Sequence, residues 1–135
     1  MRSVPVEAVA ERVIQEHYER MRKRKGHPWR APSDGLIREL KDFRRRISTR
    51  YGVQRMILFG SRARGSPHRD SDVDLIVVSP KFKRKNVVDR ASPLYMEWDL
   101  NLPVDFLCYT PEEFDELSKR PSIVREALRE GVLIS

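Results

Sequence analysis

The stretch that decides the fold runs from residue 53 to residue 78 and reads VQRMILFGSRARGSPHRDSDVDLIVV. Two short apolar runs enclose a polar segment, a pattern that predicts a strand, a loop and a second strand. The first run ends at Gly60-Ser61, and after ten residues the second begins with Asp72-Val73-Asp74. Because side chains alternate between the faces of a strand, Asp72 and Asp74 are expected on the same face.

Two carboxylates at the start of a buried strand are costly unless cations lie between them. At a separation of about 4 Å and an effective dielectric constant of about 20, two unit charges repel each other by about 4 kcal/mol. Without cations, at least one proton is therefore expected to stay on the pair near neutral pH. The pattern favours a pair of magnesium ions that carry a nucleoside triphosphate.

Gly-Ser, ten residues and Asp-x-Asp resemble the signature of the DNA polymerase β-like nucleotidyltransferase superfamily, in particular of its minimal nucleotidyltransferases. If each fixed residue occupies about one position in fifteen, the pattern arises by chance in about two or three of a thousand chains of this length. The family has a third carboxylate on a later strand, and Asp105 in the apolar run 103–109 is a fitting candidate. The resemblance covers residues 51 to 135.

This resemblance implies an α/β (α+β) fold, in which helices flank a small mixed β-sheet. Residues 51–135 are interpreted as the minimal nucleotidyltransferase domain, and residues 1–50 as a basic helical N-terminal extension of two helices. Apolar spacing predicts the first of these helices over residues 6–25. The second is expected to begin at Ser33 or Asp34, with an apolar stripe of Leu36, Leu40, Phe43 and Ile47.

Beyond the second strand, local patterns predict the remaining elements. A short helix is expected within residues 86–101, followed by a third strand from Pro103. Thr110, Pro111 and Glu113 form a capping box that begins the next helix. A last helix is expected from Pro121, and residues 132–134 are expected to add a final strand.

The resemblance assigns the metal and catalytic roles to the three aspartates. Asp72 and Asp74 would hold both magnesium ions. Asp105 would ligate the catalytic ion and help to deprotonate the acceptor hydroxyl. The activated oxygen would then attack the α-phosphorus in line, and pyrophosphate would leave. ATP is the expected donor.

Four residues around the first strand's end are expected to bind the nucleotide. Gly60 lets the backbone approach a phosphate closely, and the exposed amides of the turn, with the Ser61 hydroxyl, can bind the terminal phosphates. Arg62 and Arg64 are placed to add positive charge to the departing pyrophosphate. For both arginines, an ordinary surface position is the alternative.

The excess of positive charge lies in the first 50 residues. They hold 14 Lys and Arg against 7 Asp and Glu, whereas residues 51–135 hold 13 of each. A basic segment indicates nucleic acid or an acidic partner protein, although a solvated helix face is the alternative. The chain has a single cysteine, no apolar run that approaches about 20 residues, and no apolar core of a signal peptide. These features predict a cytoplasmic protein without a membrane partner.

Together these features predict a magnesium-dependent enzyme that transfers a nucleoside monophosphate, AMP by default, from a nucleoside triphosphate to a hydroxyl group. The minimal members of the family imply a protein acceptor, such as a HEPN toxin that this chain would adenylylate as its antitoxin. A transferase acting on tRNA or a small molecule is an alternative. Two further alternatives use the same fold: a non-catalytic antitoxin and a module that binds nucleic acid, with RNA as its partner.

Overall fold

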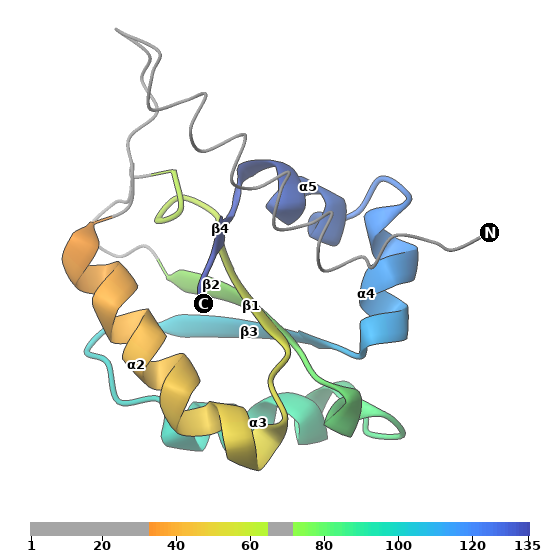
Figure 1. The fold of residues 1–135 in the computed structure, drawn as a ribbon, viewed down its shortest axis with the longest axis horizontal. Coiled ribbons are helices and arrows are strands. Elements are labelled where there is room, and N and C mark those ends of the chain that lie inside the picture. Colours follow the sequence, from red (N-terminus) through yellow and green to blue (C-terminus); the bar gives the residue numbers. More distant parts are fainter. Residues whose placement is uncertain (1–32, 65–71) are drawn as a thin grey trace, which may run out of the picture.

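The computed structural model describes residues 33–64 and 72–135 (Figure 1). The helix expected over residues 6–25 lies outside these ranges. The described elements are, in chain order, α2 (Asp34–Tyr51), β1 (Arg55–Phe59), β2 (Val73–Val78), the 3₁₀ helix η1 (Pro80–Phe82), α3 (Val87–Glu97), β3 (Val104–Tyr109), α4 (Pro111–Ser118), α5 (Ile123–Glu130) and β4 (Val132–Leu133). None of the helices in these ranges combines the length and the apolar character that a membrane span requires.

The strands form one mixed sheet in the order β3-β2-β1-β4. β1 pairs with β2 and with β4 in antiparallel orientation, whereas β2 and β3 are parallel. Two parallel neighbours need a crossover connection, and α3 lies in the connection between them. The predicted mixed sheet flanked by helices is therefore confirmed.

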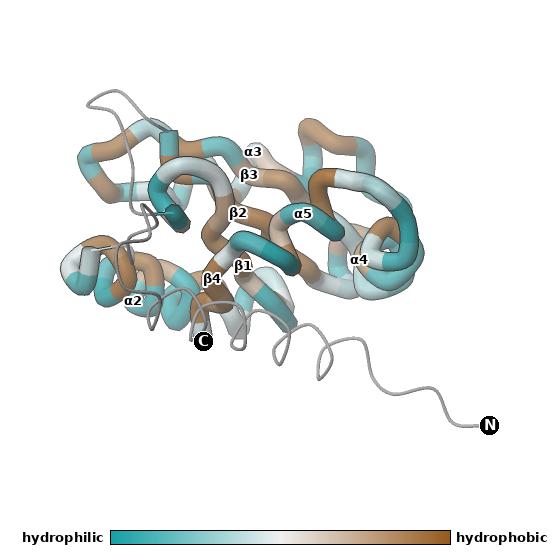
Figure 2. The backbone as a smooth tube through the Cα atoms, turned by 90° about the horizontal axis from the view of Figure 1, so that it is seen from above, coloured by the Kyte–Doolittle hydropathy of each residue, from teal (hydrophilic) through white to brown (hydrophobic). Residues whose placement is uncertain are grey.

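Each face of the sheet packs against a pair of helices (Figure 1). Met56 and Leu58 of β1 belong to the core shared with α2 and α3, whereas Ile57 between them belongs to the core shared with α4 and α5. The strands are largely brown, and the helices around them mix hydrophobic and hydrophilic positions, in Figure 2. Apolar burial on both faces explains why the strands read as nearly continuous apolar runs.

Helix α2 forms as its sequence predicts. The Ser33 hydroxyl accepts a hydrogen bond from the Leu36 amide at 3.2 Å, and Gly52, with φ of 60°, ends the helix. The predicted stripe is buried and consists of Leu36, Leu40, Phe43 and Ile47. These side chains share a core with the sheet, so the described part of the extension packs on the sheet. The division at residue 50 stays a prediction.

The two C-terminal helices begin at capped residues. Thr110 and Glu113 make the predicted capping box of α4, with Pro111 in the first turn. Helix α5 begins at Ile123, not at Pro121 as expected from the sequence. The Ser122 hydroxyl accepts a hydrogen bond from the Arg125 amide at 3.1 Å and thereby sets the start of α5 two residues later.

Strand β3 lies at one edge of the sheet, and side chains of α3 cover that edge. The Phe106 amide donates to the Tyr95 hydroxyl at 3.2 Å. Farther along, Arg90 Nη1 donates to the Cys108 carbonyl at 3.2 Å. Two backbone groups that would otherwise be open to another strand are thus occupied.

Candidate active site

Gly60 brings the backbone after β1 against the carboxylate of Asp74. Its φ is 76°, a conformation that L side chains rarely adopt, and a Cβ at this position would collide with Asp74 Oδ2. The Gly60 carbonyl accepts hydrogen bonds from the amides of Ala63 and Arg64 at 3.1 and 3.2 Å, which close a tight turn. Ala63 is fully buried and anchors that turn in the core.

Asp74 and Asp105 lie opposite each other on neighbouring parallel strands. Asp74 is also paired across the antiparallel ladder with Phe59, the residue before Gly60. Because side chains alternate along a strand, the two aspartates share the face of the sheet that carries Ile76 and Leu107. Asp74 is half-buried and Asp105 is exposed, so the pair lies at the boundary between the core and solvent.

The third aspartate, Asp72, lies exposed just before β2 begins. Its charge nevertheless acts on the Asp74 carboxyl. Burial raises the pKa of the Asp74 carboxyl, and the charges of Asp105 and Asp72 raise that pKa further, whereas Arg64 lowers it. The charges of Asp72, Asp105 and Arg64 therefore all act on the Asp74 carboxyl, in line with the expected repulsion between carboxylates.

The residues suit a hard divalent cation in charge and in donor type, because carboxylate oxygens are the ligands that magnesium prefers. A cation near Asp74 would relieve the repulsion that raises the pKa of this carboxyl. In the described part of the chain, no three His, Cys, Asp or Glu side chains form a preassembled metal-binding cluster. The assignment of Asp72, Asp74 and Asp105 as metal ligands stays a prediction.

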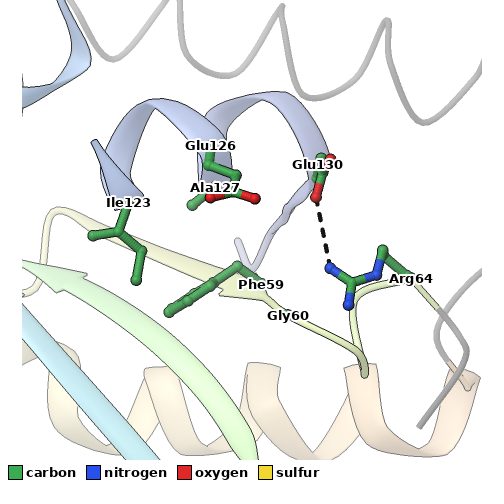
Figure 3. A pocket seen from close by; sticks show the side chains of 7 residues that line it. All are labelled: Phe59, Gly60, Arg64, Ile123, Glu126, Ala127 and Glu130. Atoms are coloured by element: carbon green, nitrogen blue, oxygen red, sulfur yellow. Dashed lines mark ion pairs between the residues drawn. The ribbon is translucent and has the colours of Figure 1, made fainter. Parts of the chain in front are cut away.

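A cavity of about 200 Å³ lies beside Gly60, between the turn after β1 and helix α5 (Figure 3). Arg64 Nη1 is 3.6 Å from Glu130 Oε2, and this ion pair spans the gap between the turn and the helix. Both side chains are partly exposed, so the pair contributes little to stability. The remaining lining residues are Phe59, Ile123, Glu126 and Ala127.

Ser61 and Arg62 lie half-buried in the turn that follows Gly60, whereas Arg64 is exposed. The structure thus places the four residues expected to bind the nucleotide in one turn, next to Asp74. Of these, Arg64 is directed toward Glu130 (Figure 3). Their contacts with phosphate groups stay predictions.

Two residues at the site were missed by the sequence-based reasoning. The Tyr95 hydroxyl lies 3.5 Å from Asp105 Oδ1, which is too long for a strong hydrogen bond but brings the phenol next to the carboxylate. Glu130 forms the ion pair with Arg64. Neither residue belongs to a local motif, because both reach the site through the packing of a helix against the sheet.

Comparisons with known proteins agree with this geometry. The family model "Nucleotidyltransferase domain" matches residues 40–134. A Methanocaldococcus jannaschii protein named "Putative protein adenylyltransferase" is 35% identical over an alignment of 71 residues, which covers 48% of this chain and 72% of that protein.

A solved structure shares the fold. It is the crystal structure of "a putative nucleotidyltransferase from Sulfolobus solfataricus", with a TM-score of 0.52 and 22% sequence identity. The match covers 90% of this chain and 85% of that one. The family match, which spans more than half of the chain, confirms the resemblance based on the Gly-Ser and Asp-x-Asp pattern. The chain belongs to the nucleotidyltransferase domain family and is a nucleotidyltransferase.

Proposed function

We propose that this enzyme transfers AMP from ATP, with magnesium, to a hydroxyl group of a partner protein. The observation that carries the proposal is the pairing of Asp74 with Asp105 on neighbouring strands, with the Gly60 backbone against the Asp74 carboxylate. Membership in the family supports nucleotidyl transfer. The name of the M. jannaschii relative supports AMP as the transferred group and a protein as the acceptor.

The chain's own residues supply distinct parts of this reaction. Asp72, Asp74 and Asp105 would hold two magnesium ions, which when bound would neutralise the carboxylates and the triphosphate. The amides of the turn after Gly60, the Ser61 hydroxyl, Arg62 and Arg64 would bind the terminal phosphates and the departing pyrophosphate.

Asp105 is suited to receive the acceptor's proton, because its side chain is exposed on β3, the outermost strand of the sheet. As the proton leaves, the acceptor oxygen forms a bond to the α-phosphorus. The bond from that phosphorus to the bridging oxygen breaks, and pyrophosphate takes the electron pair.

The motif resemblance to minimal nucleotidyltransferases supports a HEPN-type protein as the acceptor, with this chain as its cytoplasmic antitoxin. The net positive charge of the chain is compatible with an acidic partner. Labelling of a co-purified HEPN protein from ATP radiolabelled at the α-phosphate would support this role. Labelling of tRNA instead would contradict it.

The proposed chemistry is tested with Asp74→Asn. We expect magnesium–ATP to bind the parent protein in calorimetry, chelator to abolish that binding, and the substitution to lower transfer of radiolabelled AMP by at least about a hundredfold. Equal ATP affinity in magnesium and in chelator would contradict the metal role.

The same variant provides its own folding control. The folded-state pKa of Asp74 is raised, so ionisation of this carboxyl opposes folding above the unfolded-state pKa. In chelator, Asp74→Asn should therefore be at least as stable as the parent at neutral pH, with the advantage fading in acid. Loss of both transfer and thermal stability at neutral pH would show that Asp74 supports the fold instead of the chemistry.

A further inference from the structure

Helix α3 carries most of the large apolar side chains that are exposed in residues 33–64 and 72–135. Val87 is 80% exposed, Val88 68%, Tyr95 42% and Met96 86%. The fifth such residue, Ile123, lies on α5. Single exposed apolar residues are common, but several on one short helix mark a site of interaction. Val88, Tyr95 and Met96 are called the α3 face below.

The residues of the α3 face share one side of the helix with the exposed Ser92. Val88, Tyr95 and Met96 stand at positions i, i+7 and i+8, whereas Ala91 and Leu94 turn inward and are buried. The helix therefore has one apolar side in the core and a second apolar side in solvent. Packing within the described residues accounts for the first side and, on the second, for the contact of Tyr95 with Phe106.

The α3 face adjoins Asp105, the carboxylate that we propose takes the acceptor's proton. Tyr95 belongs to this face, and its hydroxyl lies 3.5 Å from Asp105 Oδ1. The Tyr95 ring is held edge-on to Phe106 of β3 at a centroid distance of 4.9 Å. A protein segment lying along α3 would thus bring its own hydroxyl group to the carboxylate that we propose takes the acceptor's proton.

A basic turn continues this surface beyond the N-terminal end of α3. Lys83, Arg84 and Lys85 are exposed, and none of them forms an ion pair with a carboxylate in the described ranges. Arg84 has a φ of 66°, a left-handed conformation that is uncommon for a residue other than glycine. The exposed Asp89 opposes part of this charge, and the turn with the first helical residues stays net positive.

We infer that the α3 face and the basic turn together are the docking surface for the acceptor. The occupant is a protein segment that combines apolar and acidic side chains and carries the hydroxyl group to be modified. The inference rests on the proposed function, whose acceptor it defines by chemistry.

Charge complementarity favours such a partner over two other occupants. Residues 1–32 of this chain hold 8 Lys and Arg against 4 Asp and Glu, so they would repel the basic turn. A second copy aligned antiparallel would offer Glu97 and Asp99 at the other end of α3. These carboxylates are already paired with Arg50 and Arg46, at 3.4 and 2.7 Å.

Two synthetic peptides test the docking surface with the full-length protein. Each presents one tyrosine among leucines and valines, and the remaining positions are all glutamate in one peptide and all lysine in the other. Transfer from radiolabelled ATP with magnesium is measured as kcat/KM. We expect the parent to prefer the glutamate peptide by at least about tenfold, the effect of a moderate interface contribution.

Substitutions on the docking surface should change this peptide preference without changing the affinity for magnesium–ATP. Lys83→Glu with Lys85→Glu should reverse it in favour of the lysine peptide. Val88→Asp with Met96→Asp should lower kcat/KM for the glutamate peptide by about tenfold through KM. The matched control is Arg125→Glu with Arg129→Glu on α5, across the sheet, which should leave the preference unchanged. Calorimetry should give the parent affinity for magnesium–ATP in all three variants.

Several results would overturn the inference. If the parent binds magnesium–ATP but labels both peptides equally or neither, α3 is not the docking surface while the proposed chemistry stands. If the parent neither binds magnesium–ATP nor labels any acceptor, the proposed function itself fails. Binding of a single-stranded RNA oligonucleotide that Lys83→Glu with Lys85→Glu abolishes would assign the surface to RNA. A dimer in analytical ultracentrifugation that Met96→Asp dissociates would assign it to a second copy.

Discussion

Gly60 meets two constraints at once, and each alone would favour glycine. Its backbone is left-handed, and its Cα faces the Asp74 carboxylate so closely that a methyl group would collide with Oδ2. The residue therefore sets how near a ligand of the turn can come to Asp74. The close approach of the Gly60 backbone to the Asp74 carboxylate places the proposed phosphate site next to the proposed metal site.

Gly60→Ala should therefore impair both stability and activity. We expect a loss of roughly 1–3 kcal/mol in the free energy of unfolding, because the left-handed backbone and the collision both oppose alanine. Transfer of AMP should fall more than the loss of folded protein explains. Chemical denaturation and transfer assays on the same samples measure the two effects.

The chain offers a matched control at Gly35. That residue lies in the first turn of α2, and nothing lies within 4 Å of a Cβ placed there. Gly35→Ala should leave transfer unchanged and stabilise the helix by up to about 1 kcal/mol. If Gly60→Ala matched the parent in both transfer and stability, Gly60 would be needed for neither the site nor the fold.

At the scale of elements, Arg90 connects α3 to the strand and the helix that follow it. Its Nη1 donates to Glu113 Oε1 at 2.6 Å and to the Cys108 carbonyl, and its Nε donates to the Lys85 carbonyl at 2.9 Å. The hydrogen bond from Arg90 is the main cause of the lowered pKa of Glu113. Only 12% of the Arg90 side chain is exposed, but 44% of the Glu113 side chain is, so their ion pair is partly shielded from water.

Arg90→Met keeps the aliphatic stem and removes all of these bonds. We expect a loss of roughly 1–3 kcal/mol in the free energy of unfolding at neutral pH. Because the folded-state pKa of Glu113 is lowered, this pair stabilises the fold above the unfolded-state pKa and loses its contribution as pH falls through the folded-state pKa. The difference between parent and variant should therefore narrow in acid.

Arg120→Met is the control for that measurement. Arg120 and Glu116 are exposed and 4.0 Å apart, so the substitution should change stability by less than about 0.5 kcal/mol. Denaturant titrations at neutral and acidic pH compare the two variants. Equal effects would mean that Arg90 contributes no more than a surface ion pair.

Local chemistry explains which elements were predictable from the sequence. The Ser33 cap and the Thr110 capping box each involve residues three positions apart, and only ten residues separate Gly60-Ser61 from Asp72-Val73-Asp74. A single sequence therefore contains the signal of each. The start of α5 was wrong by two residues because the Ser122 hydroxyl caps the helix after Pro121.

Contacts across the sheet had no such local signal. Strand register places Asp74 opposite Asp105. The sequence predicted a third carboxylate on a later strand but not this register. The approach of Tyr95 to Asp105 and of Glu130 to Arg64 depends on how α3 and α5 pack. Neither pair has a local sequence pattern that predicts it.

At the scale of the whole molecule, α2 is part of the core that supports the site. Leu40 and Phe43 are completely buried, Ile47 is nearly so, and all three pack in the core that contains Met56 and Leu58. Phe43 also stacks with Phe106, which follows Asp105 in β3. Removal of the helix would open one face of the sheet.

A chain that lacks residues 1–51 should therefore not fold. Each large core side chain contributes about 2–5 kcal/mol, and together those of α2 approach the roughly 5–15 kcal/mol of stability of a typical domain. Circular dichroism and thermal melting test this. A chain that begins at Ser33 is the matched control, because it retains the cap and the whole helix. Cooperative melting of the shorter chain would contradict the role of α2.

The covered edge of β3 has a consequence for how molecules of this protein can meet. Tyr95 and Arg90 occupy the Phe106 amide and the Cys108 carbonyl, and the opposite edge strand, β4, is only two residues long. Extended chains attach to a sheet by hydrogen bonding to free backbone groups at its border. Within residues 33–64 and 72–135, these two contacts interrupt the row of backbone groups on β3, and β4 is too short to offer one, so we expect concentrated solutions of the protein to resist filament growth by strand addition.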